Sequence, residues 1–228
     1  MTITSRAGTS ARPRPEPRGH ITADMADRIL QRFDFTERVV HWVVGVTFVL
    51  LLATGLAFAY PALFWLTALL GGGPSARVLH PWVGVVFAVG MVFMIAIWIR
   101  DMFLGDTDWR WLRAVRAYAT RDSANVPPAG KYNAGQKMFF WFQGVLAVVF
   151  VVSGVPLWFP ESFGSGLLQW MRLAHYFATL GGGLLLIVHV YLGTIAYPGT
   201  ARAMIDGTVT ERWARHHHPG WHEEQTGG

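Results

Sequence analysis

The chain of 228 residues contains no cysteine and few charged residues. Without cysteine it can form no disulfide, thiolate zinc site, cysteine-ligated iron–sulfur cluster or covalently attached c-type haem. Charged residues make up 14% of the chain and hydrophobic residues 52%, and the mean hydropathy is +0.32. A soluble domain of this length carries more charge. The composition therefore indicates an integral membrane protein, and the 25 glycines and 11 tryptophans agree with it.

Four apolar windows lack Asp, Glu, Lys and Arg and are long enough to cross about 30 Å of hydrocarbon. Because backbone groups in lipid must satisfy one another, each window predicts a helix. The expected fold class is therefore all-α, a bundle of four transmembrane helices. The predicted spans are residues 39–60, 78–99, 138–159 and 173–197.

Lysine and arginine are distributed unevenly around these spans. Seven precede the first span, seven lie between the second and the third, and three follow the fourth, whereas only Arg77 and Arg172 lie on the other side. The positive-inside rule then predicts a multi-pass protein of the bacterial cytoplasmic (inner) membrane, with both termini in the cytoplasm. This distribution accounts for the net charge of +5, so membrane lipid is an expected partner and nucleic acid is not.

The segments outside the spans divide the chain further. Residues 1–31 are polar and rich in proline and arginine, with no apolar run close enough to form a signal peptide. We expect a cytoplasmic tail there, a transmembrane domain over residues 32–200, and a histidine-rich cytoplasmic tail over residues 201–228. Residues 108–120 place apolar side chains at helical spacing with three arginines around them, which favours an interfacial helix on the cytoplasmic surface. A solvated helix packed on a partner subunit is the alternative.

Four histidines lie inside the apolar spans at two depths. His175 and His189 are 14 residues apart on the fourth span, about 21 Å along nearly the same face of one helix. Following the direction of each span, His80 lies at the outer depth of His175, and His41 at the inner depth of His189. Neutral imidazole is a good axial ligand of haem iron, so the two pairs predict two bis-histidine haems. Taken singly, each histidine could be a hydrogen-bonded interior or interfacial residue.

Two other features keep more than one interpretation. Glycines near these histidines could let porphyrin rings approach the backbone, or could simply allow helices to pack. They are Gly45, Gly84, Gly90 and the run from Gly181 to Gly183, and Gly182 is midway between the two fourth-span histidines. The histidines of the C-terminal segment could form a labile metal site, but a solvated tail is favoured; they are His216, His217, His218 and His222.

The residues around the four histidines are similar to those of one known family. From Arg32 to Trp213 the chain resembles the gamma subunit of respiratory formate dehydrogenase, its integral-membrane cytochrome b subunit. The resemblance rests on RFDFTERVVHW around His41, LHPWVG around His80, KYNAGQK before the third span, and the fourth-span pair.

This resemblance implies a four-helix bundle of cytochrome b type with two haem b groups. The histidines of that family bind the inner haem at positions matching His41 and His189, and the outer haem at positions matching His80 and His175. Quinone is reduced at a pocket that matches Asn133 and Gly135, close to His189, and Gln136 could assist.

The resemblance also implies partners. Electrons come from a molybdenum- or tungsten-dependent catalytic (alpha) subunit through an iron–sulfur (beta) subunit, cross the membrane, and reduce menaquinone or ubiquinone on the cytoplasmic side. The chain would then be the quinone-reducing subunit of an enzyme whose formate-oxidising site is on another chain. A trimer of such heterotrimers is the implied assembly.

Several alternatives stay open from the sequence. Asn133 could be the N-cap of the third span rather than a quinone ligand. The cations Arg38, Lys131 and Lys137, or Arg77 and Arg172 on the other side, could bind haem propionates or only set the topology. The whole chain could instead be the cytochrome b subunit of a nickel–iron hydrogenase or a related dehydrogenase, or a membrane anchor without a redox role.

Overall fold

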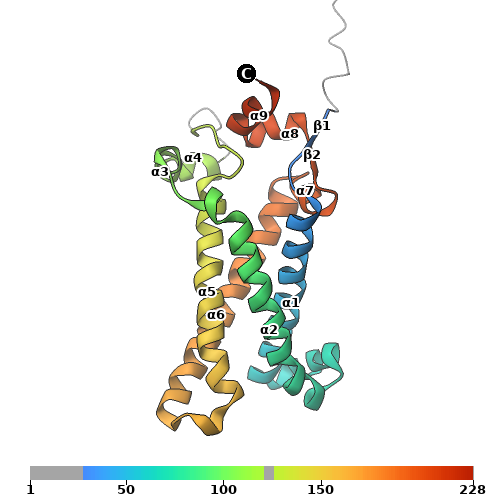
Figure 1. Ribbon diagram of the computed structural model, residues 1–228, viewed down its shortest axis with the longest axis vertical. Helices are drawn as coiled ribbons and strands as arrows, with labels where there is room; N and C mark the ends of the chain where they lie inside the picture. The colour runs from blue at the N-terminus through green and yellow to red at the C-terminus, as the bar shows by residue number, and fades with distance from the viewer. Residues whose placement is uncertain (1–27, 121–125, 228) are drawn as a thin grey trace, which may run out of the picture.

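The computed structural model describes residues 28–120 and 126–227. Four long helices form a bundle, and the described chain starts and finishes at the same end of it (Figure 1). The long helices are α1 (Phe35–Ala59), α2 (Gly73–Trp98), α5 (Ala134–Trp158) and α6 (Ser165–Tyr191). We call the end with both chain termini the capped end, because it is covered by β1 (Ile29–Gln31), β2 (Thr208–Thr210), α8 (Glu211–His217) and α9 (Pro219–Thr226).

All four long helices are long and apolar enough to cross a membrane, which confirms the predicted all-α class with four spans. Each begins several residues before its predicted window, because polar residues occupy the first turn. In α1, the Asp34 carboxylate accepts from the Glu37 amide and the Glu37 carboxylate accepts from the Asp34 amide, each at 2.8 Å. This capping box gives the free amides at the helix start hydrogen-bond partners. The helix therefore begins before the apolar window and includes charged residues such as Glu37.

Two of the long helices continue in tighter or wider turns. The 3-10 helix η3 (Ile99–Met102) extends α2, and the π-helical η6 (Leu192–Ala196) extends α6. Pro156 lies inside α5, which runs on to Trp158. At the end opposite the capped end, α1 and α2 are joined through the 3-10 helix η2 (Pro61–Leu70), and α5 and α6 through η5 (Pro160–Ser162).

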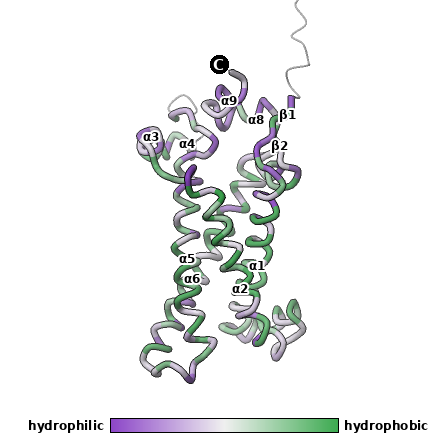
Figure 2. The backbone as a smooth tube through the Cα atoms, viewed as in Figure 1, coloured by the Kyte–Doolittle hydropathy of each residue, from purple (hydrophilic) through white to green (hydrophobic). Residues whose placement is uncertain are grey.

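The surface of the bundle is apolar along its length. Protein buries only 22% of the span windows of α1 and α2 and 11% of those of α5 and α6. Figure 2 shows hydrophobic residues along the four helices and hydrophilic residues gathered towards the capped end. Side chains that are both apolar and exposed over this length suit contact with lipid.

The helices pack as two hairpins. α1 packs most extensively against α2, and α5 against α6, while α6 makes only few contacts with α1. A mid-bundle core joins the hairpins and consists of Val44, Phe48, Phe87, Met91 and Ala147.

At the capped end, β1 pairs antiparallel with β2, and α7 (Arg202–Ile205) leads into β2. The apolar core beneath this sheet includes Leu30, Phe33, Trp98, Val209, Trp213 and Trp221. The interpretation of residues 201–228 as a solvated tail is therefore wrong: two tryptophans and a valine of this segment are buried, and burying them favours a folded cap. The N-terminal segment likewise becomes structured before residue 31; residues 1–27 of that predicted tail lie outside the described residues.

The helix predicted over residues 108–120 is divided. The structure has α3 (Asp106–Arg113) and α4 (Val115–Ala119), separated at Ala114. Asp108 accepts from the Gly105 amide at 2.9 Å and from the Lys137 ammonium at 2.8 Å, so the start of α3 is tied to α5. Trp111 of α3 is 5% exposed. One face of α3 thus packs on protein.

Gly182, midway between the two histidines of α6, makes a close helix contact. A methyl group at this position would lie 2.8 Å from Cζ of Phe48, whereas one at Gly181 would meet nothing within 4 Å. The Phe48 ring has little room to move, because its centroid lies 5.7 Å from that of Phe87 and 6.2 Å from that of Phe150. Helix packing therefore explains Gly182.

We predict that Gly182→Ala destabilises the folded protein by about 1–3 kcal/mol, the usual effect of overpacking a core. Gly181→Ala is the matched control, and it should be neutral or stabilise by up to about 1 kcal/mol, because alanine has the higher helix propensity. The thermal unfolding midpoints of the two purified variants, compared with wild type, measure the difference. Equal midpoints would contradict the packing role of Gly182.

Candidate haem and quinone sites

The structure brings the four span histidines together in two pairs. The ring centroids of His41 on α1 and His189 on α6 are 6.1 Å apart, and those of His80 on α2 and His175 on α6 are 6.4 Å apart. These are the pairs that the depth of each residue predicts. The His41–His189 pair lies nearer the capped end and is called the inner pair; the other is the outer pair.

Both separations suit one metal ion between two imidazoles. With metal–nitrogen bonds of about 2 Å and a ring centroid about 1.1 Å beyond each nitrogen, two axial imidazoles have centroids roughly 6 Å apart. Among the residues that the structure describes, no group of three or more His, Cys, Asp or Glu side chains could hold a metal. A group that brings its own equatorial ligands, as haem does, fits a site that supplies only two.

The outer pair is oriented by two hydroxyl groups. Thr54 Oγ1 lies 2.7 Å from His80 Nδ1 and donates to the Leu50 carbonyl at 2.8 Å. A hydroxyl has one proton to give, so with that proton on the Leu50 carbonyl, Nδ1 of His80 carries a hydrogen and donates to Thr54. The lone pair of Nε2 is then free for a metal.

Ser153 acts in the same way on the second histidine of the outer pair. Its Oγ lies 2.8 Å from His175 Nδ1 and donates to the Val149 carbonyl at 2.5 Å. The same proton count assigns the hydrogen of His175 to Nδ1. The sequence alone does not single out Thr54 and Ser153, because a hydroxyl in a membrane helix usually bonds its own backbone, and the spacing does not indicate which imidazole faces it.

The inner pair is held differently. The His189 ring stacks on Phe139, with centroids 4.8 Å apart and an interplanar angle of 12°. His41 meets Trp42 edge to face at 5.5 Å, and its Nδ1 is buried with no hydrogen-bond partner among the described residues. Aromatic contacts, rather than hydroxyl groups, therefore orient these two imidazoles.

The surroundings leave space beside the pairs. Each pair joins α6 to a helix of the other hairpin, and these are not the helices that pack closely on α6. A methyl group at Gly45 or Gly84, one helical turn beyond His41 and His80, would meet nothing within 4 Å. A methyl group at Gly90, in contrast, would lie 2.8 Å from a side-chain carbon of Val44. The residues present therefore fit two haem groups, and Gly45 and Gly84 match the porphyrin interpretation better than Gly90 or Gly182 does.

Three of the four predicted quinone residues, Asn133, Gly135 and Gln136, lie together at the start of α5 near the capped end, and the fourth, His189, lies on α6. Asn133 is the N-cap: its Oδ1 accepts from the Gln136 backbone amide at 2.9 Å, and the side-chain Oε1 of Gln136 accepts from the Asn133 backbone amide at 3.0 Å. A methyl group at Gly135 would lie 3.3 Å from both Asn133 Oδ1 and the Trp111 ring. The N-cap alternative therefore describes how Asn133 is held, and Gly135 permits the close approach of Trp111.

The N-cap geometry uses only one side of the Asn133 amide. Since Oδ1 accepts the backbone hydrogen, the other terminal atom is Nδ2, a donor. No hydrogen bond from Nδ2 to any described residue is present. Asn133 can thus cap α5 and still donate to a ligand.

Asn133 borders a polar cavity of about 760 Å³ that is open at the capped end. Arg32 and Tyr132 also line this cavity. Two buried atoms, Nη1 of Arg32 and the phenol oxygen of Tyr132, have no hydrogen-bond partner among the described residues. Such atoms suit bound water. Lys137 and Lys131 line the same cavity, and their ammonium groups lie 2.8 Å from Asp108 and 3.5 Å from Glu37.

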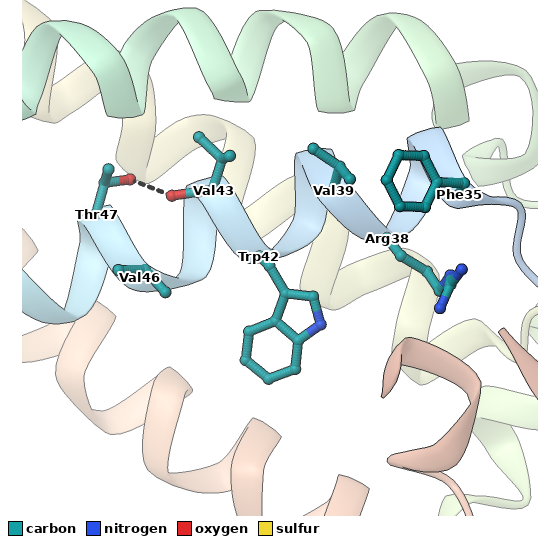
Figure 3. A pocket seen from close by; sticks show the side chains of 7 residues that line it. All are labelled: Phe35, Arg38, Val39, Trp42, Val43, Val46 and Thr47. Atoms are coloured by element: carbon teal, nitrogen blue, oxygen red, sulfur yellow. Dashed lines mark hydrogen bonds between the residues drawn. The ribbon is translucent and has the colours of Figure 1, made fainter. Parts of the chain in front are cut away.

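A second, apolar groove of about 520 Å³ runs along the outward face of α1 and is shown in Figure 3. At its capped end Arg38 donates to the Ile205 carbonyl and Trp42 to the Met204 carbonyl, each at 2.8 Å. These bonds attach α7 to α1. They also give Arg38 a backbone partner, so a haem propionate is not needed to explain its position.

Four apolar helices, two facing imidazole pairs and hydroxyls that free Nε2 together define a membrane cytochrome b. The chain belongs to the prokaryotic cytochrome b561 family, which matches residues 32–207.

Named relatives narrow the class. The chain is 33% identical over 196 residues to the cytochrome b556(fdo) subunit of formate dehydrogenase from Escherichia coli (strain K12), covering 85% of this chain and 92% of that protein. It is also 33% identical over 204 residues to the nitrate-inducible cytochrome b556(Fdn) subunit of the same strain, covering 86% and 92%. The formate dehydrogenase cytochrome b556 subunit of Haemophilus influenzae is 31% identical over 191 residues, covering 82% and 80%. The resemblance found in the sequence is thereby confirmed.

The hydroxyl contacts of the outer pair generate a prediction. A hydrogen bond from Nδ1 makes an imidazole a more electron-rich ligand, which favours ferric iron. Thr54→Val should therefore raise the reduction potential of one haem, on the order of tens of millivolts, while Thr54→Ser should not. Redox titration of the haem absorbance in the purified protein measures the shift.

Thr47→Val is the matched control, because Thr47 is on the same helix and donates to the Val43 carbonyl at 2.7 Å without touching a histidine. An equal shift in the Thr47 and Thr54 variants would mean that the effect is general to α1 and not due to His80.

Proposed function

We propose that this chain is the dihaem cytochrome b subunit of a respiratory formate dehydrogenase. It anchors the complex in the membrane and passes electrons from an iron–sulfur subunit to a quinone. The observation that carries the proposal is the presence of two histidine pairs, each with centroids near 6 Å, on one helix bundle. The printed names of the relatives favour formate dehydrogenase over a hydrogenase.

His80 and His175 would hold the outer haem b, and His41 and His189 the inner one. Haem b supplies one-electron redox chemistry when bound. The 14 residues that separate His175 from His189 lie on the continuous helix α6, which places the pairs about 21 Å apart along the bundle. The chain spans most of the membrane with two redox centres, so electrons that enter near one surface can leave near the other.

The quinone site of the proposal is the start of α5. Phe139 stacks on His189, and Asn133 lies six residues earlier on α5, roughly 9 Å nearer the capped end. The free Nδ2 of Asn133 would donate a hydrogen bond to a quinone carbonyl.

Reduction of a quinone to a quinol takes up two electrons and two protons. The open polar cavity beside Asn133 would supply water and protons to this site. Most lysines and arginines among the described residues lie near the capped end, whereas Arg77 and Arg172 lie near the starts of α2 and α6, at the opposite end. This distribution supports a cytoplasmic capped end, and proton uptake there would separate charge across the membrane.

The partners of the proposal are the iron–sulfur (beta) and molybdenum- or tungsten-dependent catalytic (alpha) subunits, with three such heterotrimers in the complete assembly. The outer pair would accept electrons from the iron–sulfur subunit. Because the chain holds no cysteine, the iron–sulfur clusters themselves belong to that partner.

We predict that Asn133→Ala in the complete complex raises the quinone KM by about tenfold, the effect of losing one hydrogen bond of roughly 1.4 kcal/mol. Formate should still reduce both haems, because the electron path to them is intact. Steady-state formate:quinone activity and the reduced haem absorbance measure these two properties. Exposed Arg212 of α8, which does not line the cavity, is replaced by alanine as a surface control.

Two outcomes would contradict different parts of the proposal. If hydrogen reduces the haem of the wild-type complex and formate does not, the chain belongs to a hydrogenase. A quinone KM that Asn133→Ala leaves unchanged would remove the quinone site from the start of α5, while the role of the histidine pairs would stand.

A further inference from the structure

The segment 126–133 ends at Asn133 and is held by both ends of the described chain. The Gly130 carbonyl accepts from His218 Nδ1 at 2.7 Å, and the Lys131 carbonyl accepts from the Arg32 guanidinium at 2.6 Å. Two successive carbonyls just before Asn133 thus have side-chain donors that lie far away in the sequence. Such bonds restrict where the backbone of this segment can lie.

The two donors are also bonded to each other. The Arg32 guanidinium lies 3.2 Å from His218 Nε2. Because arginine can only donate, His218 accepts with Nε2 and therefore donates to Gly130 with Nδ1. Burial, and next the positive charge of Arg32, lower the pKa of His218 to about 3. His218 is neutral at physiological pH, which is the form that this pair of hydrogen bonds requires.

The pair is enclosed by aromatic rings. The guanidinium carbon of Arg32 lies 4.9 Å from the ring centroids of both Trp213 and Trp221, a cation–π arrangement. Arg32 is 5% exposed and His218 2%. The Ala129 carbonyl, one residue before Gly130, accepts from the Trp221 and Gly220 amides at 3.4 and 3.1 Å. The capped end is thus assembled around the segment that precedes Asn133.

We propose that Arg32 and His218 are positioning residues of the quinone site. They fix the Gly130 and Lys131 carbonyls, and through this backbone they fix the direction of the Asn133 side chain. The inference rests on the proposed quinone role of Asn133. The folded C-terminal segment thereby has a function in the reaction. Without this segment, the Ala129 and Gly130 carbonyls would lose their hydrogen-bond donors.

The test uses the complete complex and two short-chain quinones, decylubiquinone and a short-chain menaquinone. His218→Leu should raise the KM for the quinone that the wild type reduces by about tenfold, as expected for the loss of a buried hydrogen bond. The rate of haem reduction by formate should be unchanged, because electron entry does not involve the segment. A general loss of structure would instead lower the rate of haem reduction by formate together with the rate of quinone reduction.

Two further variants separate positioning from folding. His218→Gln should restore the wild-type KM, because its amide can donate to the Gly130 carbonyl and accept from Arg32. Arg32→Met should raise the KM, because methionine can fill the space between the tryptophans but cannot donate to the Lys131 carbonyl. His216→Leu is the matched control: His216 is an exposed neighbour whose only ring contact is with His217 among the described residues, and its variant should behave as wild type.

The outcomes distinguish this inference from the proposal beneath it. A wild-type KM in His218→Leu and Arg32→Met, together with a raised KM in Asn133→Ala, would overturn the positioning role alone. A wild-type KM in all three would mean that the quinone does not bind at Asn133. Where His218→Leu fails to assemble, Arg32→Met decides, and a wild-type KM in that variant overturns the inference.

Discussion

The arrangement of the bundle depends on α6, which carries one imidazole of each pair on nearly the same face. The 14 residues between His175 and His189 are close to four helical turns, so the same helix can face α2 near one end and α1 near the other. Gly182, between them, receives the Phe48 ring and lets α1 approach at mid-height. The bundle is thus closely packed around Gly182, and the two imidazoles of α6 lie on either side of this packed region.

The two pairs differ in what holds them. Hydroxyls on α1 and α5 contact Nδ1 of both histidines of the outer pair. Aromatic rings surround the inner pair, and among the described residues His41 Nδ1 has no hydrogen-bond partner. Under the proposed function, this difference would lower the reduction potential of an outer haem relative to an inner one, and so favour electron transfer towards the quinone site at the start of α5.

The sequence predicts the four spans and the pairing well, because hydropathy and helical geometry determine depth directly. It does not predict Thr54 and Ser153, since their contacts depend on how α1 and α5 rotate against their neighbours. It also gives the wrong interpretation of the C-terminal segment. His218 and Arg32 are 186 residues apart in the sequence, and a polar, histidine-rich stretch resembles a solvated tail until its tryptophans find the core at the capped end. Asn133 shows the opposite case: the two alternatives from the sequence are compatible, because one amide group has both an acceptor and a donor.

The haem content per chain tests the central claim most directly. A pyridine haemochrome assay on purified protein, produced with haem available, should give two b-type haems for each polypeptide. A single haem would mean that one of the two pairs does not bind iron. Folded protein with no haem would contradict the electron-transfer function and leave a membrane anchor.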